Sequence, residues 1–247
     1  MLFISIHKVL RNGISPKNFL IHATDNIQET KDNQRALEQP EEYKQRQFDT
    51  LRQVFDVLNF SGIPYVILRN FEKMPDEVNV DPNHLDVDIL VNDYYALKRI
   101  VDGDSPQEFF WDHCENGFHR VVNYVLIDGK RISFDVRSIG DNYLDEKWQK
   151  DILERRVEFR SGIYVPSEED HLYSLIYHAV IQKTKVSETF VKVFRDIANY
   201  TVEQAKDRVF LRAKLDAFLD KHGYSMVKPH DKSVGYFINA DPKRSKS

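Results

Sequence analysis

The sequence predicts an α+β fold, in which a mixed β-sheet core flanked by helices is followed by a C-terminal helical subdomain. Short strand-like apolar segments gather between residues 65 and 137, whereas after residue 145 the apolar residues recur at helical three- and four-residue steps. Strands first and helices after are typical of this class. We expect an N-terminal extension over residues 1–40, an α/β core over 41–165, a helical subdomain over 166–223 and a polar tail over 224–247.

The first expected helix covers residues 42–60. Four apolar residues recur there on one helical face: Phe48, Leu51, Phe55 and Leu58. Gly62 provides the left-handed residue that a helix C-cap favours, and Pro64 prevents continuation. A short buried strand is then expected over residues 65–68.

The next elements complete the predicted sheet. A second strand is expected over residues 85–91, and Asn92 or Asp93 is placed to cap a helix over residues 94–101. Two further apolar stretches, residues 121–127 and 131–137, flank Asp128-Gly129, a dipeptide that favours a tight type I′ turn. They therefore predict a β-hairpin.

The remaining sequence is predicted to be mostly helical. Helices are expected over residues 145–156, from Ser167 through Lys183, over 188–200, and from Thr201 to Gly223, with a short strand pair at 157–159 and 163–165. Ser167 and the pair Thr201 and Gln204 have the spacing of helix N-terminal caps.

Composition limits the function classes. The formal charge of −4 gives no broad electrostatic footprint for nucleic acid, so a polyanionic polymer is disfavoured as a substrate. A single cysteine, Cys114, excludes an intramolecular disulfide framework and a Cys-based zinc cluster. No apolar run reaches membrane-spanning length, and we expect a cytoplasmic protein without membrane contact.

Three acidic residues form the candidate site. Asp86 and Asp88 share one face of their strand, roughly 6.5–7 Å apart, because side chains alternate along a strand. At that separation their repulsion costs about 2–2.5 kcal/mol at an effective dielectric near 20. Asp135 lies on the polar side of another strand. If the two strands are neighbours, the three carboxylates suit a Mg²⁺ or Mn²⁺ site, because such cations prefer oxygen ligands.

A structural interpretation of the same residues stays open. Alternating Asp residues on a half-exposed strand are common. Asp135 has Arg131 and Arg137 as candidate ion-pair partners, and Arg69 has Glu72 and Asp88.

The layout of these segments resembles the nucleotidyltransferase superfamily, which includes DNA polymerase beta-like enzymes, CCA-adding enzymes and aminoglycoside nucleotidyltransferases. The resemblance covers roughly residues 45–140 and rests on a strand ending at Arg69-Asn70, on the strand carrying Asp86 and Asp88, and on Asp135 in a later strand. It implies that Asp86 and Asp88 ligate metal and that Asp135 binds the catalytic metal or acts as base. The implied reaction transfers a nucleoside monophosphate from a nucleoside triphosphate to a hydroxyl, releasing pyrophosphate.

One departure from the superfamily pattern concerns the phosphate-binding turn. The family usually has Gly-Ser where this chain has Arg69-Asn70. Arg69 offers a bidentate phosphate contact and Asn70 a side-chain donor. Lys183, or Lys185 beside it, is the expected cation from the helical subdomain, whereas His178 is expected to be a partly buried structural histidine.

Three functional interpretations follow. The first is a magnesium-dependent nucleotidyltransferase acting on a small molecule, a sugar or a protein hydroxyl. The second is a catalytically silent domain of the same type that binds a nucleotide or a partner. The third is a plain α+β interaction module with an incidental acidic strand.

Overall fold

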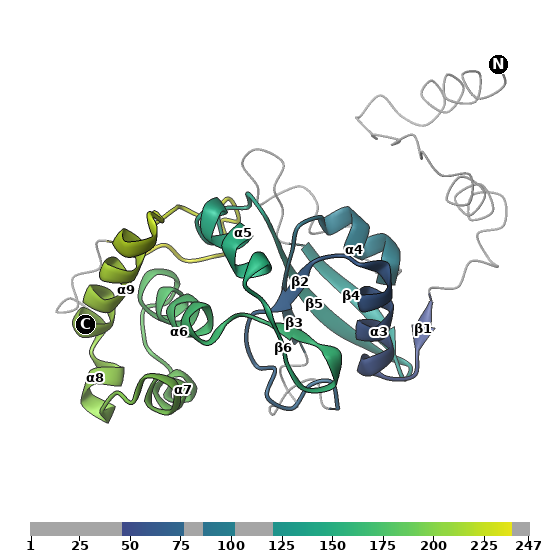
Figure 1. Ribbon diagram of the computed structural model, residues 1–247, viewed down its shortest axis with the longest axis horizontal. Helices are drawn as coiled ribbons and strands as arrows, with labels where there is room; N and C mark the ends of the chain where they lie inside the picture. The colour runs from purple at the N-terminus through teal and green to yellow at the C-terminus, as the bar shows by residue number, and fades with distance from the viewer. Residues whose placement is uncertain (1–45, 77–85, 102–120, 239–247) are drawn as a thin grey trace, which may run out of the picture. The chain divides into compact units, whose positions relative to one another are not determined.

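The computed structural model describes residues 46–76, 86–101 and 121–238, and Gln45–Ser247 form one compact unit (Figure 1). Its centre is a five-stranded mixed sheet with the order β1-β4-β5-β3-β2. The α+β class is therefore confirmed. The strands are β1 (Gln47–Phe48), β2 (Tyr65–Ile67), β3 (Asp86–Val91), β4 (Val121–Ile127) and β5 (Lys130–Ser138).

The connections of the sheet explain its mixed character. β4 and β5 form the expected antiparallel hairpin, and Asp128 and Gly129 in its turn both have positive φ, 48° and 69°. Positive φ at both central residues is the mark of a type I′ turn. β3 pairs parallel to β5 and antiparallel to β2, whereas β1 pairs parallel to β4.

The two faces of the sheet carry different side chains because the strands alternate. One face is apolar and packs under α3 (Leu51–Ser61) and α4 (Tyr94–Val101). The buried strand residues of this face include Ile67, Val87, Ile89 and Phe134. The opposite face carries Asp86, Asp88, Asp135 and Arg137 on the intervening positions, and it is this face that forms the candidate site.

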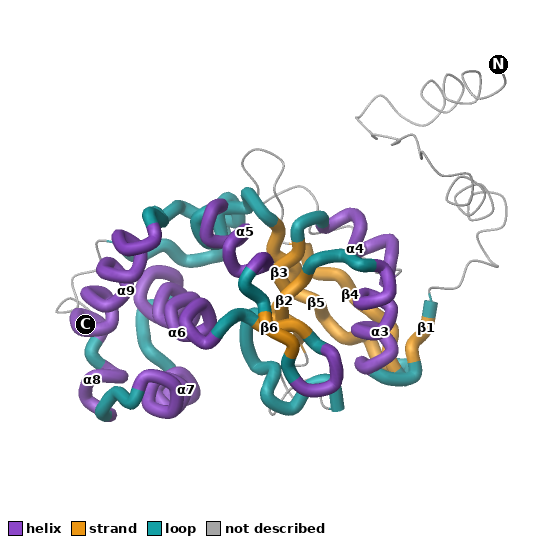
Figure 2. The backbone as a smooth tube through the Cα atoms, in the orientation of Figure 1, coloured by secondary structure: helices purple, strands orange, loops and turns teal. Residues whose placement is uncertain are grey.

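A second hydrophobic core joins the sheet to the helical region, whose helices are purple in Figure 2. Its helices are α5 (Glu146–Glu154), α6 (Glu168–Tyr177), η3 (His178–Gln182), α7 (Glu188–Ala198), α8 (Val202–Lys206) and α9 (Arg208–His222). Trp148 is fully buried in this core and donates its indole N–H to Asp170 over 3.0 Å. A small two-stranded sheet, β6 (Val157–Glu158) with β7 (Tyr164–Val165), lies between α5 and α6 in sequence, as expected.

The prediction of a helix over residues 42–60 is wrong at its start. Gln47 and Phe48 belong to β1, and α3 begins only after Thr50, whose side chain accepts a hydrogen bond from the Gln53 amide. A hydroxyl cap satisfies an amide that has no partner inside the helix, and it fixes the helix start there. Residues 42–45 lie outside the described residues.

Two C-terminal helices also differ from prediction. The helix that begins after Ser167 changes to a π-helical turn, η3, and ends at Gln182. The single helix expected between Thr201 and Gly223 is two helices, because Asp207 interrupts the first and caps the second through the amides of Val209 and Phe210. The cap of Thr201 with Gln204 is present as predicted.

The described part of the segment expected to be a polar tail, residues 224–238, packs on the helices. Tyr224 and Asp231 are buried, and the Phe237 amide donates to the carbonyl of Ile181 over 2.7 Å. The described residues contain no helix long and apolar enough to cross a membrane. Cys114, residues 1–40, Leu85 and residues 239–247 lie outside the described residues. The four-part division of the chain stays a prediction.

Candidate functional site

The two acidic strand segments lie side by side. β3 and β5 are parallel neighbours, and Asp88 and Asp135 are direct register partners across them. Neighbouring strands are about 4.8 Å apart, so the two carboxylates start from adjacent positions on the same face. Asp86 lies two residues earlier on β3 and is more exposed than Asp88. The expected adjacency of the strands is therefore present.

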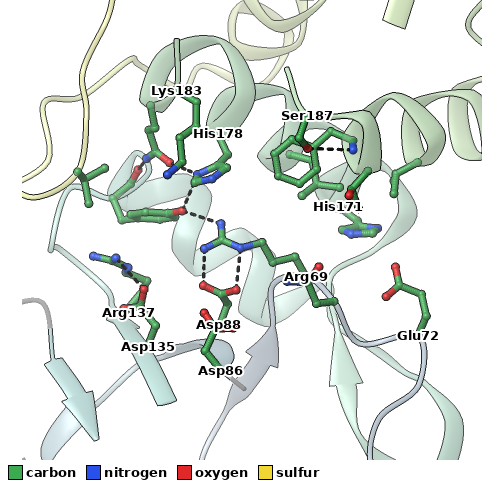
Figure 3. Close-up of a pocket in the computed structure, with 18 of the residues that line it drawn as sticks. Arg69, Glu72, Asp86, Asp88, Asp135, Arg137, His171, His178, Lys183 and Ser187 are labelled. Carbon is green, nitrogen blue, oxygen red and sulfur yellow. Dashed lines mark hydrogen bonds and ion pairs between the residues drawn. The ribbon is translucent and has the colours of Figure 1, made fainter. Parts of the chain in front are cut away.

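These carboxylates lie in a cavity of about 1170 Å³ between the sheet and the helices (Figure 3). The sheet contributes one wall. α6 and η3 contribute His171, Leu175, His178 and Gln182, which recur at helical spacing along one face. All six residues singled out from the sequence line this cavity: Arg69, Asn70, Asp86, Asp88, Asp135 and Lys183. Lys185 is not among its lining residues, and the roles expected for the six stay predictions.

Arg69 holds Asp88 with a two-point ion pair. Its Nε donates to Asp88 Oδ2 over 2.7 Å, and its Nη2 donates to Oδ1. The side chain of Asp88 is only 5% exposed and that of Arg69 16%. Burial alone lowers the pKa of the Arg69 guanidinium, but the charge of Asp88 and the hydroxyl of Tyr143 more than offset this, so that the pKa rises above its ordinary value. Arg69 therefore carries a permanent positive charge in the site.

Asn70 makes the turn that follows β2. Its φ is 58°, in the left-handed region that asparagine tolerates better than most residues other than glycine. The chain therefore makes this sharp turn without the small pair that the resemblance leads one to expect, and it directs the Arg69 side chain across the cavity.

A chain of hydrogen bonds continues from Arg69 into the helices. Arg69 Nη1 donates to the Tyr143 hydroxyl over 2.9 Å, and this hydroxyl lies 3.1 Å from His178 Nδ1. His178 Nδ1 lies 2.8 Å from Gln182 Oε1, and Gln182 Nε2 donates to the Tyr143 carbonyl. Burial, followed by the charge of Arg69, lowers the pKa of His178 well below its ordinary range. The expectation of a partly buried, hydrogen-bonded histidine at this position matches the geometry.

Arg137 forms a second ion-pair centre. Its Nη2 lies 3.2 Å from Asp135 Oδ2 and its Nη1 lies 3.1 Å from Asp231 Oδ2. The guanidinium also lies over the Tyr143 ring, 4.3 Å from its centroid. Burial raises the pKa of Asp231, but hydrogen bonds from Ser233 and the charge of Arg137 outweigh burial, and the net shift is downward. Asp231 therefore stays ionised and anchors the C-terminal segment to the sheet.

His171 gives the cavity a neutral imidazole. Its ring is nearly buried and packs against Phe71, with 4.8 Å between the ring centroids. Burial lowers the pKa of His171 to about 4. In Figure 3, His171 and Glu72 lie on one side of the Arg69 side chain, whereas Asp135 and Arg137 lie on the other.

The residues do not fit a divalent cation in the arrangement that the structure shows. Among residues 46–76, 86–101 and 121–238, no group of three or more His, Cys, Asp or Glu side chains is placed to hold a metal ion. The reason is local: both oxygens of Asp88 accept from Arg69, and Asp135 pairs with Arg137. In this arrangement Asp88 and Asp135 each belong to a carboxylate–guanidinium pair, and the Mg²⁺ or Mn²⁺ site expected at Asp86, Asp88 and Asp135 stays a prediction.

Three residues of the site were not singled out from the sequence. Tyr143 lies in the loop before α5, Asp231 in the segment expected to be a tail, and Gln182 at the end of η3. None belongs to a motif with a fixed spacing from the acidic strands. Only the packing of distant segments brings them to Arg69 and Arg137.

No protein-family model matches the chain, and no curated protein matches it. Two solved structures are similar to it. One is an antigenic nucleotidyltransferase-like protein from Paracoccidioides brasiliensis, with 15% identity and a TM-score of 0.36 over 71% of this chain and 89% of that chain. The other is the antibiotic-resistance factor ANT(2'')-Ia, with 10% identity and a TM-score of 0.36 over 70% of this chain and 91% of that chain. Similarities at this TM-score support no conclusion about function.

Proposed function

We propose that this chain is a nucleotidyltransferase-type domain that binds a nucleoside triphosphate in the cavity between the sheet and the helices. The observation that carries the proposal is that Asp88 and Asp135 are register partners on neighbouring parallel strands. They line a cavity that is also lined by Arg69 and Lys183. Guanidinium and ammonium groups are the usual partners of phosphate oxygens. At about 1170 Å³ the cavity is larger than the 300–1,000 Å³ or so typical of small-molecule sites.

Nucleotide binding without catalysis is the form of this function that the geometry supports best. Arg69 occupies both oxygens of Asp88, and Arg137 pairs with Asp135. Both arginines are largely buried, and breaking a buried ion pair is costly because it leaves a charge without compensation. Asp88 and Asp135 are therefore already paired with arginine in the ligand-free protein.

A second candidate is metal-dependent transfer of a nucleoside monophosphate to a hydroxyl of a small-molecule, sugar or protein acceptor. The observation that favours it is that Asp86, Asp88 and Asp135 all line one cavity that has room for an acceptor beside a triphosphate. This candidate requires Asp88 and Asp135 to exchange their arginine partners for Mg²⁺ or Mn²⁺.

Calorimetric titration of the protein with each of the four common nucleoside triphosphates, with Mg²⁺ and with EDTA, tests the proposal. We expect saturable binding of at least one of them, and Lys183→Ala should weaken it roughly tenfold. Lys185→Ala is the matched control, because this neighbouring lysine does not line the cavity.

A parallel assay for pyrophosphate release separates the two candidates. Binding without pyrophosphate release in the presence of acceptor-containing cell extract supports the silent domain, whereas release that is lost in Asp88→Ala supports the transferase. No binding of any of the four triphosphates contradicts both candidates and supports a plain interaction module.

A further inference from the structure

We infer that the Arg69 guanidinium occupies the position on Asp88 that a divalent metal ion would otherwise take. The cavity consequently binds its triphosphate in the metal-free form. This inference rests on the proposed nucleotide binding and names the ionic form of the ligand. The acidic residues of the cavity suit a divalent cation by their chemical type, but their contacts with arginine do not.

The contacts of Asp88 place a positive charge where a metal would bind. The Nε and Nη2 groups of Arg69 meet the two carboxylate oxygens side by side, in the bidentate geometry that makes such pairs strong. Asp88 is almost fully buried. A hydrated magnesium ion gives up its water ligands reluctantly, and so it competes poorly for a carboxylate already held in this way.

The donor count of Arg69 shows how it can serve a phosphate as well. A guanidinium has five N–H donors. Two of the Arg69 donors contact Asp88 and one contacts Tyr143, so two of the five have no acceptor among the residues that the structure describes. Arg69 lines the cavity, so these two donors can bind a phosphate oxygen while the ion pair with Asp88 stays intact. The guanidinium then bridges carboxylate and phosphate, as a divalent cation does in metal-dependent sites.

The other cations of the cavity supply charge that a metal would otherwise bring. Lys73, Lys183 and Lys192 line the same cavity. Arg137 is held by Asp135 and Asp231 and keeps the Asp135 charge compensated. A metal-free triphosphate therefore meets a wall in which the carboxylates of Asp88 and Asp135 are already paired with arginine, and in which Lys183 and Lys192 can contact phosphate.

Binding of Mn²⁺ to the nucleotide-free protein, measured by the electron paramagnetic resonance signal of free Mn²⁺, tests the occupancy of Asp88 directly. We expect no stoichiometric Mn²⁺ site in the wild-type protein, and one new site in both Arg69→Ala and Arg69→Gln. Arg52→Ala is the matched control, because it removes an arginine from an exposed Arg–Asp pair that does not line the cavity. A stoichiometric site in the wild-type protein, or none in either Arg69 variant, overturns the inference.

Binding of the preferred nucleoside triphosphate tests the ligand form. We expect the wild-type protein to bind it at least as tightly in EDTA as in Mg²⁺, because Mg²⁺ competes with the protein for the free triphosphate. A loss of affinity of more than about tenfold in EDTA overturns the inference and leaves the proposed nucleotide binding standing. If no triphosphate binds under either condition, the proposed function fails, and the Mn²⁺ measurements still decide whether Arg69 holds the cation position.

Discussion

The two arginine–aspartate centres of the cavity differ in how deeply the arginine is buried and in how many carboxylates hold it. Arg137 lies between Asp135 and Asp231, stacks on Tyr143, and has a side chain only 7% exposed. Arg69 has one carboxylate partner and a side chain 16% exposed. The comparison indicates that Arg137 holds the structure together and that Arg69 is placed to bind a ligand.

Removal of Arg137 should give the largest effect on stability. Arg137→Met leaves Asp135 and Asp231 buried without their cation, and breaking a buried pair in this way costs about 3–5 kcal/mol. The free energy of unfolding from urea titration measures the loss. Arg52→Met, in an exposed pair, should cost less than about 1 kcal/mol. A loss in Arg137→Met as small as in this control would remove the distinction between the two centres.

Acid pH should give the next largest effect, through a histidine on the Arg69 side of the cavity. The pKa of His171 is about 4 in the folded protein and near 6.5 in the unfolded chain. Between these values the unfolded state binds the proton and the folded state does not, so the free energy of unfolding falls as pH drops below 6.5 and is unaffected above it. At pH 5 this amounts to about 2 kcal/mol.

Urea unfolding at pH 7 and pH 5 measures this effect in the wild-type protein and in His171→Leu. The wild type should lose about 2 kcal/mol more than the variant between the two pH values, because the variant has no imidazole to protonate at this position. His178 is present in both proteins, so its contribution in the same direction cancels. Equal losses in the two proteins would show that His171 is not held neutral by burial.

Substitution of Tyr143 should give the smallest effect and separates the two centres most cleanly. Tyr143→Phe removes the hydroxyl that accepts from Arg69 and keeps the ring under Arg137. We expect a loss of about 1 kcal/mol in the free energy of unfolding. Tyr143→Leu removes the ring as well and should cost more. If the two variants were equally stable, the ring would contribute nothing to the Arg137 centre.

Most of the sheet was predictable because its signals are local. The alternation around Asp86 and Asp88, and the Asp128-Gly129 turn, identify β3 and the β4–β5 hairpin without tertiary information. β1 was not predictable: it has two residues, and Phe48 also fits the helical spacing of α3. Its partner, Ile127, lies far away in the sequence, so only the fold defines the strand.

The candidate site was predictable in its carboxylates and not in their partners. Strand alternation places each carboxylate on the polar face of its own strand, and the parallel pairing of β3 with β5, which the sequence left open, makes Asp88 and Asp135 neighbours. Whether these carboxylates pair with a metal ion or with arginine depends on how far the Arg69 side chain extends after the Asn70 turn. It also depends on the C-terminal segment that brings Asp231 back to the sheet. Both contacts join segments that have no fixed spacing in the sequence, so the sequence alone does not predict them.

Asp88→Asn tests the central claim most directly, through titration of the wild type and the variant with the preferred nucleoside triphosphate in EDTA and in Mg²⁺. If Arg69 binds the phosphates, removing one negative charge beside it should tighten binding about three- to tenfold under both conditions. Asp76→Asn, in the exposed pair with Arg52, should leave the affinity unchanged. Triphosphate binding that the wild type shows only in Mg²⁺ and that Asp88→Asn loses, with a fully folded protein, would contradict the account and indicate that Asp88 holds a metal ion for the ligand.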